Sequence, residues 1–166
     1  MREAQRGSEA ALERLFRAHW GPAHRAAYLV VHDDAAAEDI AQEAFLAAVR
    51  NLDRFDRRRP FGPWLHRIVV NRAIDFARAR ALRRELAGEG AEPAAAERPR
   101  EDRAGELAAA LAELAPEHRA VIVLRYLLEY TPGEIAELLE LPRGTVNSRL
   151  RRGLDRLELR LREEAP

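Results

Sequence analysis

The chain has 166 residues, of which 28 are basic and 28 acidic, so its formal net charge is zero, and it contains no cysteine. The length allows one or two small domains, and the lack of cysteine excludes a disulfide framework, a thiol nucleophile and cysteine-ligated zinc. Because there is neither an apolar run of about 18 residues to span a bilayer nor a signal-peptide pattern after Met1, we expect a soluble, cytoplasmic protein.

The first predicted elements are two helices. Residues 10–28 have a helical period, although Gly21-Pro22 predicts a kink or a break. Asp33 or Asp34 can cap a second helix that runs to about Asn51. Its buried face is expected to contain Ile40, Ala41, Ala44, Phe45, Ala48, Val49 and Leu52, and its outer face Glu38, Asp39, Gln42, Glu43 and Arg50.

Residues 33–43 contain five acids and no base. A surface rich in carboxylates repels DNA, so this face belongs on a surface that meets protein. A plain solvated helix face is an equally good interpretation when the segment is considered alone.

A loop over residues 55–62 and a helix from Trp64 to about Leu86 follow, with Pro63 at the first helical position. Residues 55–84 contain nine Arg against two Asp, a net charge of +7. Cations combined with the rings of Phe55, Phe61 and Trp64 are typical of surfaces on which unstacked bases lie. Taken individually, Phe61 and Trp64 fit a hydrophobic core better.

The next segment has the composition of a linker. Between Ala87 and Gly105 there is no Val, Ile, Leu or aromatic residue, and residues 85–102 contain six acids against two Arg. Such a stretch buries too little apolar surface to offset its ordering entropy. We therefore expect a helical domain over residues 1–86, a flexible acidic linker over 87–105 and a second domain over 106–166.

The second domain is predicted to be helical throughout. Helices are expected over 107–114 and 116–130, and Thr131-Pro132-Gly133-Glu134 has the form of a capping box that starts another, short helix. Leu141-Pro142-Arg143-Gly144 ends that helix, and a last helix reaches Arg162. No strand-like alternation occurs, so the fold class is all-α, with two small helical domains.

The short capped helix, the tight turn and the final helix form a helix-turn-helix pattern. Residues 143–162 contain seven Arg against two acids. Val146, Leu150, Leu154 and Leu157 repeat at helical spacing and are expected to face the core, which leaves Thr145, Asn147, Ser148, Arg149, Arg151 and Arg152 outside. A recognition helix needs this arrangement, because its first residues reach base edges and its cations meet phosphates. A solvated face in a plain bundle is the alternative.

Catalytic patterns are missing. The five His residues lack metal-ligand spacing, and no P-loop, dinucleotide or serine-hydrolase motif is present. A helical hydrolase using His32 with Asp33 or Asp34 is a rival hypothesis, although helix capping explains the aspartates more simply. We expect no enzyme, no cofactor and no metal.

Several motifs together carry a resemblance to a known family. The segments 39–45 (DIAQEAF) and 61–71 (FGPWLHRIVVN) resemble the first conserved domain of bacterial sigma-70-like factors. The segments 114–119 (LAPEHR), 134–136 (EIA) and 141–149 (LPRGTVNSR) resemble their other conserved domain. The order of these motifs and the small size point to the extracytoplasmic-function (ECF) subgroup of RNA polymerase sigma factors.

The resemblance implies specific partners and sites. It implies binding to core RNA polymerase, through the β′ clamp helices and the β subunit, to promoter DNA and to an anti-sigma factor. The implied polymerase-binding residues are Glu38, Asp39, Gln42, Glu43 and Phe45. Those implied for the −10 element are Phe55, Arg57, Arg58, Arg59, Phe61, Trp64, Arg67, Asn71, Arg72 and Asp75. Those implied for the −35 element are Arg143, Thr145, Asn147, Ser148, Arg149, Arg151 and Arg152.

One loop departs from the pattern of the family. Many relatives have an acidic, glycine-containing loop where this chain has Asp56-Arg57-Arg58-Arg59-Pro60. The −10 sequence that this chain recognises therefore cannot be taken from those relatives. The alternative function is a stand-alone dimeric helix-turn-helix regulator that binds a palindromic operator. The Arg-rich and aromatic segment before the linker counts against that alternative, because such a regulator does not need it.

Overall fold

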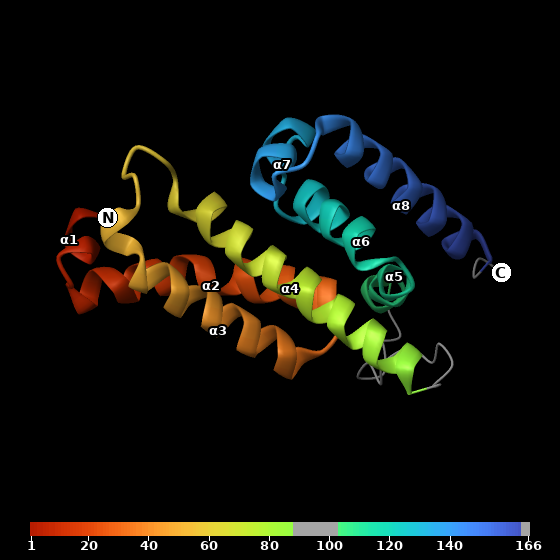
Figure 1. Ribbon diagram of the computed structural model, residues 1–166, viewed down its shortest axis with the longest axis horizontal. Coiled ribbons are helices and arrows are strands. Elements are labelled where there is room, and N and C mark those ends of the chain that lie inside the picture. The colour runs from red at the N-terminus through yellow and green to blue at the C-terminus, as the bar shows by residue number, and fades with distance from the viewer. Residues whose placement is uncertain (88–102, 164–166) are drawn as a thin grey trace.

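The computed structural model describes residues 1–87 and 103–163, and these contain helices and no strand. The N-terminal unit comprises α1 (Arg2–Gln5), α2 (Glu9–Val31), α3 (Asp34–Arg50), the 3-10 turn η1 (Leu52–Arg54) and α4 (Phe61–Leu86). The C-terminal unit comprises α5 (Arg103–Ala112), α6 (Pro116–Ile122), the π-helical turn η2 (Val123–Leu127), α7 (Pro132–Leu139) and α8 (Arg143–Glu163) (Figure 1). The predicted all-α fold is confirmed.

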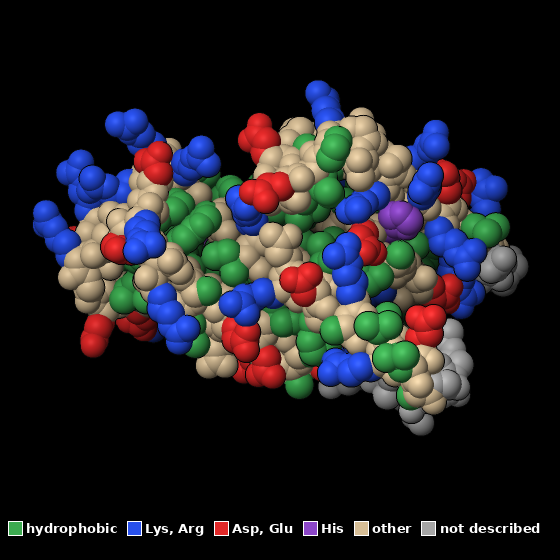
Figure 2. Space-filling view, viewed as in Figure 1, with side chains coloured by type: hydrophobic (Ala, Val, Ile, Leu, Met, Phe, Trp, Pro, Cys, Tyr) green, Lys and Arg blue, Asp and Glu red, His purple; other side chains and the backbone are tan. Residues whose placement is uncertain are grey.

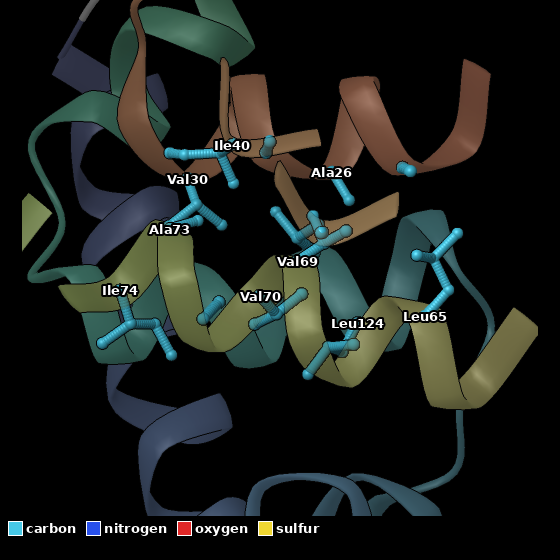
Figure 3. Close-up of a cluster of buried hydrophobic side chains, with 14 of the residues drawn as sticks. Ala26, Val30, Ile40, Leu65, Val69, Val70, Ala73, Ile74 and Leu124 are labelled. Carbon is cyan, nitrogen blue, oxygen red and sulfur yellow. The ribbon is translucent and has the colours of Figure 1, made fainter. Parts of the chain in front are cut away.

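Small side chains let the helices of the N-terminal unit approach closely. α2, α3 and α4 pack against one another, and the facing surfaces contain fully buried alanines such as Ala26, Ala44 and Ala73. Val30, Leu65 and Val69 fill the space between them (Figure 3). This packing gives α4 a rigid support, so the backbone positions that carry its outer side chains are fixed.

The predicted helix caps are present. The side chain of Asp33 accepts a hydrogen bond from the Ala36 amide at 3.0 Å and starts α3. Thr131 and Glu134 form the predicted capping box at the start of α7, where the Thr131 hydroxyl accepts from the Glu134 amide and the Glu134 carboxylate accepts from the Thr131 amide at 2.8 Å. In each cap, a side chain bonds to the backbone amide of a residue only three positions away. Such a short-range pattern can be recognised in the sequence alone.

Three element boundaries differ from the predictions. α2 continues through Gly21 and Pro22 without a break, because its packing against α3 and α4 outweighs the local helix-breaking preference. α4 begins at Phe61 rather than at Trp64, since the first-turn amides of a helix need no intrahelical partner and Pro63 is tolerated there. The helix that starts at Pro116 ends at Ile122 and continues as the π-helical turn.

The predicted linker and core need two corrections as well. α5 starts at Arg103, so the last linker positions belong to a helix, whereas residues 88–102 lie outside the described part of the chain. Val49 and Leu154 were expected in the core but are 43% and 38% exposed. Both lie at the edge of their helix's apolar stripe, where helical spacing alone does not distinguish core from rim.

Candidate nucleic-acid and protein interfaces

The acidic face of α3 is presented to solvent. Glu38, Asp39, Gln42 and Glu43 are exposed, and the Glu43 carboxylate pairs with Arg72 of α4 at 2.5 Å. Phe45 differs from the other predicted residues, because it is only 6% exposed and lies against Phe16 with a centroid distance of 5.1 Å. Phe45 therefore supports α3 from inside the fold.

The loop between η1 and α4 carries a group of exposed cations. Arg57, Arg58 and Arg59 are all exposed, and Figure 2 shows basic side chains gathered at this end of the molecule. The Asp56 carboxylate accepts a hydrogen bond from the Arg58 amide at 3.0 Å and so orders the tip. Gln5 holds the base of the loop, since its amide donates to the carbonyl oxygens of residues 52 and 55 at 2.8 and 3.0 Å.

The aromatic residues of this region pack against each other. Phe55 and Phe61 are 8% and 6% exposed, and Trp64 stacks on Phe55 with a centroid distance of 4.6 Å. Phe61 lies edge-on to Trp64 at 5.7 Å. Their positions favour the core interpretation for Phe61 and for Phe55, while the partly buried Trp64 forms the rim of the cluster.

The polar residues that were predicted to bind the −10 element from the helix after the loop lie along α4, but they are not equally exposed to solvent. Asn71 and Asp75 are exposed. Arg72 forms an ion pair with Glu43 of α3. Arg67 forms an ion pair with Glu140, the residue that follows α7. The structure thus brings this face of α4 against the C-terminal unit, which the sequence did not reveal.

The helix-turn-helix has the predicted geometry. α7 ends at Leu139, and the left-handed backbone of the next residue, Glu140 (φ 55°, ψ 44°), turns the chain toward α8. Val146 and Leu150 are buried. Among the predicted −35 residues, Arg143, Asn147, Arg151 and Arg152 are exposed, and Thr145, Ser148 and Arg149 are half-buried. The Ser148 hydroxyl donates to the Thr145 carbonyl at 2.9 Å. The hydroxyl proton of Ser148 is therefore already bonded within the helix.

The hydrolase hypothesis is not supported by the surroundings of His32. His32 is only 5% exposed, and burial, together with the nearby Arg119, lowers its pKa to about 3. Asp33 caps α3 and pairs with Arg80 at 3.1 Å rather than orienting the imidazole.

The described residues contain no cluster of three or more side chains able to hold a metal ion. None of their helices has the length and apolarity needed to cross a membrane.

Comparison with known proteins matches both units to one family. The Sigma-70 region 2 family matches residues 15–83, and the Sigma-70, region 4 family matches residues 104–157. The chain is 32% identical to the ECF RNA polymerase sigma factor SigW of Bacillus subtilis, with 98% of this chain and 95% of the relative aligned.

Solved structures have the same fold. The structure of CnrH in complex with the cytosolic domain of CnrY has a TM-score of 0.72 and 30% identity, with 98% of this chain and 95% of that chain covered. The sigma factor RpoE of Bartonella quintana, solved in complex with the anti-sigma factor NepR, has a TM-score of 0.76 at 20% identity, with 92% and 98% covered. The latter likeness concerns the fold alone.

Proposed function

The chain belongs to the extracytoplasmic-function group of sigma-70-type RNA polymerase sigma factors, and on this basis we propose a role for each exposed surface described above. As a sigma factor it directs transcription initiation and is a regulatory DNA-binding protein rather than an enzyme. The family match over two separate units disfavours the stand-alone dimeric regulator.

The acidic face of α3 is proposed to bind core RNA polymerase, at the β′ clamp helices. The observation that carries this assignment is the row of exposed side chains Glu38, Asp39 and Gln42 on a helix with a fully packed inner face. A basic protein surface complements such a row, whereas DNA does not. Phe45 acts indirectly, because it is buried beneath this face and fixes the helix.

The basic loop and α4 are proposed to bind the −10 element. The exposed Arg57, Arg58 and Arg59 supply phosphate contacts, and the rim position of Trp64 leaves part of its ring for a base. Asn71 and Asp75 are the exposed polar side chains on the adjoining helix. Phe55 and Phe61 shape the cluster from below.

α8 is proposed to read the −35 element. Its exposed cations Arg143, Arg151 and Arg152 surround Asn147 on the first turns of the helix. Arg recognises guanine and Asn recognises adenine through paired hydrogen bonds in the major groove. Binding to an anti-sigma factor, of the kind present in the structure of the relative RpoE, belongs to the same proposal. So does a cytoplasmic location.

In vitro transcription with purified core polymerase tests this function. The chain is combined with core enzyme on a library of promoter fragments, and start sites are mapped by sequencing the transcripts. We expect initiation at a defined promoter class that is absent with core enzyme alone. Absence of initiation on every fragment, with folded chain and a core enzyme that another sigma factor activates, would falsify the proposal.

A further inference from the structure

The short helix α1 lies against the base of the loop that the proposed function assigns to the −10 element. α1 packs against α2 and against η1, the 3-10 turn that leads into this loop. Figure 1 shows α1 at the same end of the molecule as the loop. Residues that are 47 and 50 positions apart in the sequence are hydrogen-bonded there, and no charge pattern or motif of the sequence connects them.

Packing and an ion pair attach α1 to the rest of the N-terminal unit. Ala4 is 3% exposed and belongs to the same buried cluster as Leu52 and Phe55. Glu3 pairs with Arg14 of α2 at 2.7 Å. α1 therefore offers the base of the loop a support that is itself tied to the long helix α2.

One side chain of α1 bonds to two backbone carbonyls at the base of the loop. Gln5 Nε2 donates to the carbonyl oxygen of Leu52 at 2.8 Å and to that of Phe55 at 3.0 Å. An amide nitrogen carries two hydrogens, so one group can bond to two acceptors at once. Because both partners are acceptors, the reversed amide, with its oxygen toward them, would make neither bond. The Gln5 amide therefore links α1 to both ends of the segment 52–55.

Phe55 connects this link to the surface that is proposed to bind a base. Its backbone carbonyl is held by Gln5, and its ring stacks on Trp64 with a centroid distance of 4.6 Å. Trp64 is the partly buried ring at the rim of the aromatic cluster. A shift of the backbone at Phe55 would displace the ring on which Trp64 rests. Gln5 therefore acts on the position of Trp64 through Phe55.

The same link holds the residue that precedes the basic tip of the loop. Asp56 orders the tip locally, because its carboxylate accepts from the Arg58 amide at 3.0 Å and its carbonyl from the Arg59 amide at 3.0 Å. These bonds fold the tip on itself and do not join it to a helix. Arg57, Arg58 and Arg59 carry like charges, which repel one another in the free chain. The bond from Gln5 to the carbonyl of residue 55 ties the start of this tip to α1.

We propose that Gln5 is a positioning residue for recognition of the −10 element, because it holds the base of the loop so that Trp64 and the arginines of the tip meet DNA in one arrangement. The inference rests on the proposed −10 role of this loop. Preorganisation of this kind reduces the entropy lost on binding and makes the fit depend on the bound sequence. Without the link the charges remain, so attraction to phosphates persists while selectivity falls.

Hydrogen–deuterium exchange of the full chain tests whether Gln5 orders the loop. Gln5→Met keeps an unbranched side chain of similar length without the donor, and Glu3→Gln, which breaks the ion pair with Arg14 in the same helix, is the matched control. We expect the amides of residues 54–59 to exchange about 5- to 20-fold faster in Gln5→Met, with those of residues 65–74 of α4 unchanged. Gln5→Lys, whose ammonium group can donate to the same carbonyls, should restore most of the protection. Loop exchange in Gln5→Met equal to that of the control would overturn the proposal.

Transcription from two promoter libraries tests the consequence for recognition. One library randomises the −10 element and the other the −35 element, and core polymerase transcribes both with the parent chain or with a variant. We expect Gln5→Met to reduce the preference for favoured −10 sequences about 3- to 10-fold, while its −35 preference equals the parent's. Gln5→Lys should recover most of the −10 preference, and Glu3→Gln should retain it.

The outcomes separate the role of Gln5 from the proposed function. An unchanged −10 profile in Gln5→Met, or an equal loss of preference in both libraries, would overturn the positioning role and leave the proposed function intact. A parent chain that initiates on no fragment, with a core enzyme that another sigma factor activates, would overturn the proposed function and the positioning role together.

Discussion

The guanidinium of Arg119, on α6, donates a hydrogen bond to the carbonyl oxygen of Val30, the next-to-last residue of α2 and 89 positions earlier in the chain. The same side chain donates to the carbonyl oxygens of Ala112 and Leu114 at 2.8 and 2.7 Å. One guanidinium therefore donates to carbonyl oxygens at the C-terminal end of α2 and to others at and just after the C-terminal end of α5. Burial lowers the pKa of Arg119 only to about 10, so it remains charged at neutral pH.

Replacing Arg119 by Met should reduce the free energy of unfolding by about 2–4 kcal/mol, because three carbonyl oxygens lose a donor inside the fold. Arg119→Lys should lie between this variant and the parent, since an ammonium group keeps the charge but does not reproduce the planar fork. Urea unfolding followed by circular dichroism measures the change. Arg156→Met, at an exposed position of α8, is the control and should change stability by less than about 0.5 kcal/mol. Equal effects of the two Met variants would contradict the assigned role.

Acidification from pH 7 to pH 5 should destabilise the fold through His66 and His32. Burial, with a contribution from His19, lowers the pKa of His66 to about 4, and the pKa of His32 is about 3. The unfolded chain, with an ordinary His pKa near 6.5, binds more protons than the folded chain in this window, so stability falls as the pH falls. The expected loss is about 2 kcal/mol per histidine. His66→Gln should reduce the pH dependence by about half, and an unchanged slope would exclude His66 as a source.

Gly153 lies where α8 packs against α6. A Cβ atom at this position would lie 2.7 Å from Cδ1 of the buried Ile122. Gly153→Ala should therefore cost roughly 1 kcal/mol net, because overpacking outweighs the gain in helix propensity. Gly21→Ala, at an open position of α2, has the same propensity gain without the clash and should raise the thermal midpoint. A higher midpoint in both variants would show that Ile122 moves aside without cost.

The −35 assignment predicts different effects for neighbouring arginines of α8. Arg152→Ala or Arg149→Ala should weaken promoter binding by the holoenzyme by about 1–3 kcal/mol and relax the preference at one −35 position, if the residue contacts a base. Arg156→Ala, one turn further along the helix, should leave the sequence preference unchanged. Sequencing of transcripts from a −35 library measures the preference. A profile identical to the parent's would remove that residue from direct readout.

The acidic face of α3 predicts a selective defect in polymerase binding. Glu38→Arg/Asp39→Arg reverses two exposed charges that pair with no described residue, and it should weaken binding to core polymerase at least about 10-fold while single-stranded DNA binding is kept or improved. Glu43 is less suitable, because reversing it would also free Arg72. Asp53→Arg, in η1, is the control for added positive charge. Core affinity equal to the control's would mean that this face is only solvated.

Local patterns account for the features that the sequence predicted well. The capping box of Thr131 and Glu134, the cap at Asp33 and the helix-turn-helix boundaries involve residues three or four positions apart. Boundary errors arose where packing overrode a local preference, as at Gly21-Pro22, where the helix runs through. The aromatic residues show the same limit, because apolar rings before a basic helix fit either a core or a base-stacking surface until their neighbours are known.

The sequence by itself determined the helical fold class, the separation into two units and the alternation of acidic and basic segments, because periodicity, capping and charge are properties of nearby residues. Only the tertiary structure decided which charges are available to a partner. Arg67 is paired with a residue 73 positions away and Arg119 with one 89 positions away. No local spacing encodes such pairs, since they depend on how α2 and α4 pack against the C-terminal unit. Two pairs of opposed charges, Arg67 with Glu140 and Arg78 with Glu117, meet across that interface.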